Sequence, residues 1–277
     1  MNIPEGVATI ANYEQLLDSA EFKKLEAYSN EFLLKHETEL EPYGSDWVRD
    51  PLHQWSRQWE YPFVADQVEQ TASAAAGSPV KMLDAGSGVS FFPYFLVERH
   101  QGLELTCCDM DQSLPEVYQR LNEQRSQNVS FTVQDIRRTS FEADTFDIVS
   151  CISVLEHTEE YPRIIEEFAR ILKPGGVLVL TFDISQDGCS DIPLAEAKRL
   201  MAKLRERFAI EHQEDLEDEL ANRRIVTTRY AQVIDPAWLP WRHPLLSSIL
   251  AAARKRKLPP AMVKQLTFAC YACQKRP

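Results

Sequence analysis

The chain has 277 residues, of which 44% are hydrophobic, and a formal net charge of −12. This length can bury a sizeable core, in one large domain or in a domain with an appended segment. The acidic balance argues against a nucleic-acid backbone as the main partner, because phosphate binding needs concentrated positive charge. No apolar run approaches the roughly 20 residues that would cross a bilayer, and the first residues lack the features of a signal peptide. We therefore expect a cytoplasmic protein with neither a membrane nor a nucleic-acid partner.

Residues 1–78 are expected to form a helical cap with an aromatic lid. Apolar residues recur at helical spacing over residues 12–40, among many acidic ones. Residues 55–62 (WSRQWEYP) then place three aromatic side chains beside Arg57 and Glu60. This segment either closes over a ligand pocket or anchors the N-terminal helices to the core, and the sequence leaves both interpretations open.

Residues 79–277 are expected to form an α/β core. Between residues 79 and 183 short apolar runs alternate with amphipathic ones, which is typical of a parallel sheet with crossover helices. We expect strands over 80–84, 103–108, 129–133, 146–152 and 177–182, and helices over 91–98, 114–124 and 161–172.

A variable segment over residues 184–262 is expected to follow, inserted before the last strand. It should contain an amphipathic helix from residue 194, a charged and solvated stretch over 214–223 and a strand over 224–228. The last strand is expected over residues 266–273.

The cysteines do not indicate a metal site. Cys270 and Cys273 have C-x-x-C spacing, but they lie in the last expected strand. Side chains three apart on a strand point to opposite faces and cannot share a metal ion. We expect buried thiols that act as small hydrophobic groups.

A glycine turn follows the first core strand, in the sequence Asp84-Ala-Gly86-Ser87-Gly88-Val-Ser90. Glycines allow a sharp turn and a close approach of the backbone to a ligand. The amide groups and helix N-terminus beyond such a turn suit a small polar ligand. A dinucleotide fingerprint is the obvious rival, but its third glycine position would fall on Phe91, where helix–strand packing needs a very small residue.

Four further segments follow in order. They are LTCCDMD over 105–111, VQDI over 133–136, FDIVSCISVLEH over 146–157 and LKPGG over 172–176. Together with the glycine turn they resemble the motifs of the class I S-adenosylmethionine-dependent methyltransferases. The resemblance covers residues 79–183, with Ser90 at the third glycine position of the first motif.

The resemblance implies a doubly wound, mostly parallel seven-stranded sheet and S-adenosylmethionine as cofactor. Asp84, Gly86, Ser87 and Gly88 would form the turn at the cofactor. Asp109, with Asp111 as the alternate, would accept the ribose hydroxyls, and Met110 would cover the adenine. The remaining implied contacts are Asp135 and Ile136 with the adenine, Ser153 in the loop over the sulfonium, and Arg57 and Tyr61 with the cofactor carboxylate or the acceptor.

The acceptor side is less specified. Methyl transfer from a sulfonium needs alignment and sometimes a base, but no metal and no covalent nucleophile. His157 is the best candidate base, and Asp183 at the end of the fifth strand could orient an amine or a hydroxyl. Either residue could instead only shape its loop.

We expect a small-molecule acceptor methylated at oxygen or nitrogen. A protein or peptide methyltransferase, and a non-catalytic protein that binds S-adenosylmethionine, are the main alternatives. Aminopropyl transfer on the same fold and an NAD-dependent dehydrogenase are further ones. The acceptor and the oligomeric state stay open.

Overall fold

The computed structural model describes residues 2–41, 50–126, 129–158, 160–188, 191–222, 224–239 and 264–276. Its strands are β1 (Gly6–Val7), β2 (Val80–Ala85), β3 (Leu103–Asp109), β4 (Ser130–Val133), β5 (Phe146–Ile152), β6 (Leu172–Ser185), β7 (Ile192–Pro193), β8 (Phe208–Ile210) and β9 (Leu266–Lys275). Its α-helices are α1 (Ile10–Leu17), α2 (Ala20–Lys35), α3 (Glu37–Leu40), α4 (Arg57–Ala74), α5 (Phe92–Arg99), α6 (Leu114–Glu123), α7 (Tyr161–Ile171), α8 (Leu194–Arg207), α9 (Leu216–Asn222) and α10 (Thr228–Ile234). Two 3-10 turns, η2 (Leu155–His157) and η3 (Pro236–Trp238), complete the described elements.

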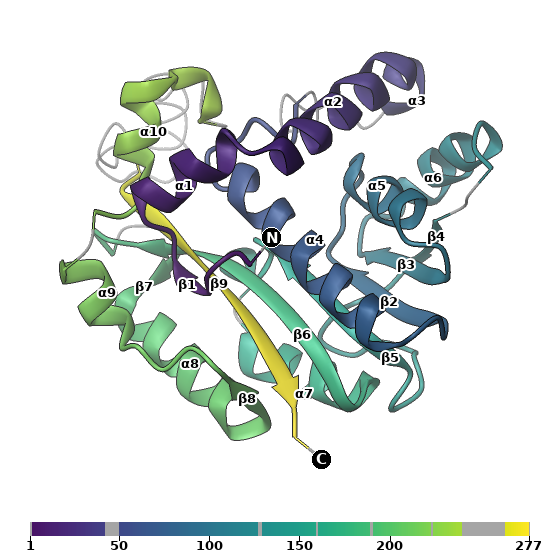
Figure 1. Cartoon of the computed structure of the whole chain (residues 1–277). Helices are drawn as coiled ribbons and strands as arrows, with labels where there is room; N and C mark the ends of the chain where they lie inside the picture. The colour runs from purple at the N-terminus through teal and green to yellow at the C-terminus, as the bar shows by residue number, and fades with distance from the viewer. Residues whose placement is uncertain are drawn as a thin grey trace, which may run out of the picture.

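All of these strands belong to one mostly parallel sheet (Figure 1). The longest hydrogen-bonded path crosses seven strands in the order β1-β9-β6-β5-β2-β3-β4, with β7 attached to β6 and β8 to β9. β2, β3, β4, β5 and β6 run parallel, whereas β9 is antiparallel to its neighbours β1, β6 and β8. The chain passes from β2 outward to β4 and then returns to β5 beside β2. This reversal confirms the expected doubly wound fold, and a ligand cleft is expected at the carboxyl ends of the strands beside it.

Two hydrophobic cores cover the two faces of the sheet. One is formed with α1, α2, α4, α5 and α6, and the other with α7, α8 and α9. Cys270 belongs to the first core and Cys273 to the second, and both are free thiols. The C-x-x-C pair therefore points to opposite faces of β9, as the strand assignment predicted.

The expected core elements agree with the structure to within a few residues, except at β6. This strand begins at Leu172 and includes Pro174-Gly175-Gly176, which we expected as a turn before the strand. Gly175 has a φ of +77°, so the chain bends there while it remains part of the strand.

Most of the aromatic stretch 55–62 forms the first turns of α4, which continues through Pro62. Trp55 and Trp59 are almost completely buried, at 2% and 1% exposure. These two side chains therefore anchor the cap to the core, and only part of the stretch is available for a ligand.

One expectation for the variable segment was wrong. Residues 224–228 form no strand: Ile225 makes an isolated bridge to Thr9, and α10 begins at Thr228. The charged stretch 214–223 contains α9 and is mostly exposed, as expected, but Glu219 on this helix is 1% exposed and accepts a hydrogen bond from the backbone N–H of Val7. Residues 240–263, with much of the expected insertion, lie outside the described residues.

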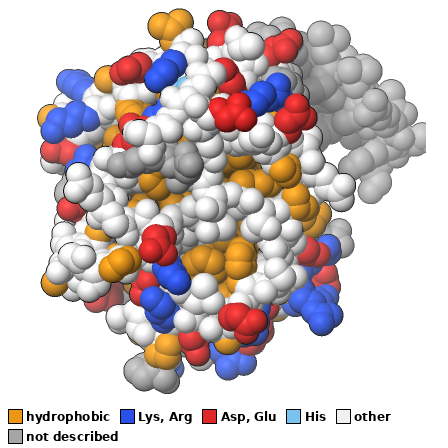
Figure 2. All heavy atoms as spheres, turned by 90° about the vertical axis from the view of Figure 1, so that its right-hand side faces the viewer, with side chains coloured by type: hydrophobic (Ala, Val, Ile, Leu, Met, Phe, Trp, Pro, Cys, Tyr) orange, Lys and Arg blue, Asp and Glu red, His pale blue; other side chains and the backbone are white. Residues whose placement is uncertain are grey.

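The surface seen from the right-hand side of Figure 1 carries acidic and basic side chains interspersed around apolar ones (Figure 2). None of the helices in the described ranges is long and apolar enough to cross a membrane.

Candidate functional site

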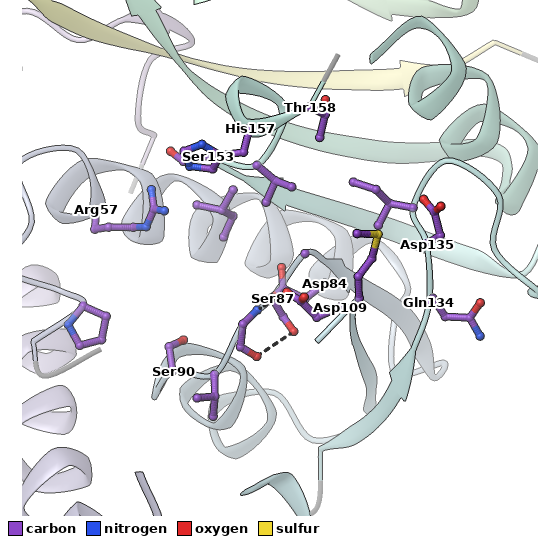
Figure 3. A pocket seen from close by; sticks show the side chains of 18 of the residues that line it. Arg57, Asp84, Ser87, Ser90, Asp109, Gln134, Asp135, Ser153, His157 and Thr158 are labelled. Carbon is purple, nitrogen blue, oxygen red and sulfur yellow. Dashed lines mark hydrogen bonds between the residues drawn. The ribbon is translucent and has the colours of Figure 1, made fainter. Parts of the chain in front are cut away.

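A cavity of about 730 Å³ opens at the carboxyl ends of the parallel strands (Figure 3). Arg57 and His157 lie towards one end of it, and Gln134 and Asp135 towards the other (Figure 3). The lining residues are Pro51, Gln54, Arg57, Tyr61, Asp84, Gly86, Ser87, Gly88, Val89, Ser90, Asp109, Met110, Gln134, Asp135, Ile136, Arg137, Ile152, Ser153, Val154, His157, Thr158 and Glu160. Every candidate residue from the sequence lies on this list except Asp183 and Asp111, the alternate ribose acid.

The glycine turn forms the floor of the cavity. Gly86 has a φ of +72°, and a Cβ atom on it would lie 2.7 Å from Cγ2 of Val154. Only glycine fits both the backbone conformation and the space. Ser90 Oγ accepts a hydrogen bond from the N–H of Phe92, the first residue of α5, at 3.2 Å, although the N-cap position itself is Phe91.

Asp84 is the last residue but one of β2, beside this turn, and is only 6% exposed. Its Oδ1 accepts a hydrogen bond from Ser150 Oγ at 2.7 Å. Burial raises the pKa of Asp84 to about 6, although the bond from Ser150 opposes the shift. The carboxylate is therefore charged at neutral pH with much of its hydrogen-bonding capacity directed at the cavity.

Asp109 ends β3 and holds the glycine turn. Its Oδ2 accepts a hydrogen bond from the backbone N–H of Gly88, and its Oδ1 accepts one from the N–H of Asp111. Asp111 in turn caps the start of the next segment through Ser113. This arrangement suits Asp109 as the ligand-facing acid and Asp111 as a capping residue.

The far end of the cavity combines apolar and charged side chains. Met110 is 58% exposed and Ile136 7% exposed, and both line the cavity. The Asp135 carboxylate forms a bidentate ion pair with the guanidinium of Arg137, with contacts of 2.8–3.0 Å. These hydrogen bonds lower the pKa of Asp135, so the acid stays charged while its partner occupies part of its hydrogen-bonding capacity.

At the opposite end α4 contributes Arg57 and Tyr61. The Tyr61 ring stacks on Phe92, with 4.5 Å between centroids, and the Arg57 guanidinium lies 6.0 Å from the Tyr61 centroid. Arg57 forms an ion pair with Glu60 and its side chain is 11% exposed. The cap thus brings one cation to a part of the cavity that is otherwise acidic.

His157 lies at the cavity edge in η2, and its pKa is lowered mainly by burial. A neutral imidazole at physiological pH can accept a proton. Asp183 lies behind the lining, and its Oδ1 is buried without a hydrogen-bond partner among the described residues. Burial and the charge of neighbouring Glu156 raise the pKa of Asp183, and burial raises the pKa of Glu156 to about 8.

Sequence reasoning assigned no role to Glu60, Gln134 or Arg137. Gln134 and Arg137 flank the expected Asp135-Ile136 pair, so their place in the cavity follows from the motif once the strand end is fixed. Glu60 was noticed only as a partner for Arg57. Glu60 also contacts Ser153, on the turn that follows β5. The two residues are 93 positions apart in the sequence, so no local pattern predicts this contact.

The described residues contain no group of three or more histidine, cysteine or acidic side chains arranged to hold a metal ion. The cavity instead suits an organic ligand, since it combines apolar walls with a few convergent polar groups.

Comparison with known proteins finds methyltransferases. Residues 83–180 match the methyltransferase domain family. A ubiquinone biosynthesis O-methyltransferase from Coxiella burnetii (strain Dugway 5J108-111) is 35% identical over 97 residues, which cover 35% of this chain and 41% of the relative. Its counterpart from Xanthomonas oryzae pv. oryzae (strain PXO99A) is 28% identical over 155 residues, which cover 53% and 61%. The chain thus spans about two fifths to three fifths of the length of these curated relatives.

Solved structures with similar folds include a putative sarcosine dimethylglycine methyltransferase from Galdieria sulphuraria, with a TM-score of 0.51 and 17% identity over 76% of this chain and 86% of that one. A geranyl diphosphate methyltransferase in complex with S-adenosylmethionine gives 0.52 and 16% identity, over 78% and 86%. The [4+2]-cyclase SpnF gives 0.51 and 20% identity, over 79% and 82%. These likenesses concern the fold, and the sequence match concerns the segment with the motifs. Residues 83–180 are therefore similar in sequence to the methyltransferase domain family, and the chain shares the fold of these solved structures.

Proposed function

We propose that the protein is an S-adenosylmethionine-dependent methyltransferase that acts on a small molecule. The observation that carries this proposal is the pairing of the Gly86–Gly88 turn with Asp109 at the floor of a cavity of about 730 Å³. The match of residues 83–180 to the methyltransferase domain family supports it.

Each part of the cofactor has a matching group in the cavity. Asp109 keeps lone pairs for two ribose hydroxyls, and Met110 and Ile136 offer apolar faces for the adenine. Arg57 suits the methionyl carboxylate and Asp84 the methionyl ammonium group, because the charges are complementary. Gly86 leaves free the space that a Cβ atom would take.

When bound, S-adenosylmethionine supplies an activated methyl group. The protein aligns the acceptor with this group and keeps water away. We assign His157 as the base that takes the proton of an acceptor hydroxyl or amine, since it lies at the cavity edge with a lowered pKa. Asp183 is assigned a supporting role behind the lining, next to Glu156.

Relatives named as O-methyltransferases favour a hydroxyl acceptor for this chain. The [4+2]-cyclase SpnF carries a similar fold, so this architecture also accommodates a reaction other than methyl transfer. We therefore separate the test of cofactor binding from the test of turnover.

The first experiment is calorimetric titration with S-adenosylhomocysteine, with NAD as the control ligand. We expect micromolar binding of S-adenosylhomocysteine and none of NAD. A folded protein that does not bind S-adenosylhomocysteine would refute the proposal. Incubation of the protein with methyl-labelled S-adenosylmethionine and a small-molecule extract, with mass spectrometry of the products, then tests transfer. Label in peptides instead would indicate a protein methyltransferase, and binding without label in any product would indicate a non-catalytic protein.

A further inference from the structure

Glu60 connects the cap to the cavity wall. It lies on α4, its side chain is fully buried, and its Oε1 accepts a hydrogen bond of 2.7 Å from Ser153 Oγ on the turn after β5. Its other oxygen, Oε2, pairs with the guanidinium of Arg57. A buried carboxylate is retained only when such partners compensate its desolvation, so the three side chains form one fixed unit.

Ser153 occupies an unusual backbone conformation. Its φ is +49°, in the left-handed region that L residues rarely adopt. The backbone N–H of Ser153 also donates hydrogen bonds to two atoms of Thr181, the carbonyl oxygen at 3.1 Å and Oγ1 at 3.0 Å. Such a conformation persists only where the surroundings over-determine it, and Glu60 supplies the contact from the cap side.

The position of this turn decides the shape of the cavity. Val154 follows Ser153 directly and packs against Gly86, and His157 lies one 3-10 turn further on. Ser153, Val154 and Arg57 all line the cavity, whereas Glu60 does not. Glu60 therefore acts on the cavity through two of its neighbours.

We propose that Glu60 is a positioning residue of the cofactor pocket. It holds the Ser153 turn and the Arg57 guanidinium in the geometry that receives the methionyl part of the cofactor. The inference rests on the proposed function, because it assumes that S-adenosylhomocysteine occupies this cavity.

The test is the affinity for S-adenosylhomocysteine, measured by calorimetry on folded protein. Glu60→Gln keeps the size of the side chain but removes the charge that orients Arg57, and we expect about tenfold weaker binding, as for loss of a charged hydrogen bond. Ser153→Ala removes only the hydroxyl that reaches Glu60, and we expect a loss of similar size. The affinity of the double variant should fall by less than the product of the two single fold-losses, because both substitutions disturb the same contact.

Asp66→Asn is the matched control. Asp66 is a second buried carboxylate on α4, 7% exposed, which accepts hydrogen bonds from the N–H of Ile3 and from Gln70 away from the cavity. Its substitution should lower the melting temperature and leave the affinity unchanged. A purely structural Glu60 would behave in the same way.

Four outcomes separate the possibilities. Wild-type affinity in Glu60→Gln, or an equal loss in Asp66→Asn, would overturn the positioning role. If Glu60→Gln does not fold, Ser153→Ala decides, and wild-type affinity there would also overturn it. Failure of the wild-type protein to bind S-adenosylhomocysteine would instead refute the proposed function itself.

Discussion

Asp109 Oδ2 lies 3.0 Å from the backbone nitrogen of Gly88, so one carboxylate joins the end of β3 to the glycine turn after β2. Its second oxygen accepts a further backbone hydrogen bond from Asp111. Each carboxylate oxygen can accept more than one hydrogen bond. Asp109 can therefore organise the turn and still receive ribose hydroxyls, which gives it a structural role besides the binding role expected from the sequence.

Asp109→Ala should therefore reduce both affinity and stability. Loss of hydrogen bonds to a charged group costs roughly 1.5–3 kcal/mol, or about one to two decades in the affinity for S-adenosylhomocysteine. The melting temperature should fall as well, because the Gly88 amide loses its partner. Asp109→Asn keeps one acceptor for that amide and should lose less of both. Unchanged affinity in the alanine variant, measured by calorimetry, would contradict this role.

Gly86→Ala should destabilise the fold by at least about 2 kcal/mol. A positive φ costs an L residue roughly 1–2 kcal/mol, and the new methyl group would collide with Val154. Adding Val154→Ala removes the collision but not the backbone strain, so the double variant should recover only part of the loss. Urea denaturation of wild type and these two variants measures the cost of the backbone strain and the cost of the collision. Full recovery of the unfolding free energy in the double variant would show that the positive φ of residue 86 imposes no cost on alanine.

The affinity for S-adenosylhomocysteine should fall as the pH drops through about 6. Burial raises the pKa of Asp84 to about 6, so the carboxylate is charged above that pH and neutral below it. The charged form is the one that attracts a methionyl ammonium group. Asp84→Asn should bind more weakly near pH 7.5 and lose the step at pH 6. Calorimetry between pH 5 and 8 tests the prediction, and an equal step in the variant would assign it to another group.

His157→Ala should leave the affinity for S-adenosylhomocysteine within about twofold of wild type and lower turnover by about 10²–10⁴-fold, the usual contribution of a general base. The residue lies at the cavity edge, and its lowered pKa keeps the imidazole neutral at pH 7. Single-turnover rates with labelled S-adenosylmethionine separate the two effects. A variant with wild-type turnover would leave His157 with a role in loop shape only.

The ion pairs of His53 should stabilise the cap at neutral pH and weaken in alkali. Its Nδ1 lies 2.8 Å from Asp50 and its Nε2 2.9 Å from Glu26 on α2, and these contacts raise its pKa to about 9, that with Asp50 most. Because the folded pKa is raised, the stabilisation is fully present below the unfolded value near 6.5 and is lost as the pH rises through 9.

For these partly exposed pairs we expect a contribution of about 1 kcal/mol. It is measured as the difference in unfolding free energy between wild type and His53→Gln at pH 6.5 and at pH 9.5. The difference should shrink at the higher pH. A constant difference would mean that the charge on His53 contributes nothing.

The α/β core was largely predictable because its signals are local. The apolar runs mark the strands themselves. The acids at 84 and 109 and the glycines at 86 and 88 lie at or next to strand ends, and parallel strands bring these ends to one edge of the sheet. The fold class followed from that, and so did the place of ten of the twelve candidate residues that line the cavity, whereas Arg57 and Tyr61 come from α4. The roles of those residues remain predictions.

Long-range contacts limited the rest. Glu60 looked like the surface partner of Arg57, and only the packing of α4 on the sheet brings it to Ser153. Asp183 looked like a pocket residue because it follows the usual strand end, yet it lies behind the lining. The strand expected over 224–228 did not form, because Ile225 makes only an isolated bridge to Thr9 and α10 begins at Thr228.

The N-terminal segment also protects an edge of the sheet. Gly6 and Val7 pair with Cys270 and Ala269, while β8 covers the other end of β9. Removal of residues 1–9 would expose unpaired backbone groups on a long apolar strand, and such edges pair readily with other molecules. We expect a trimmed protein to self-associate, so these two residues contribute to the colloidal behaviour of the whole molecule although they lie far from the cavity in sequence.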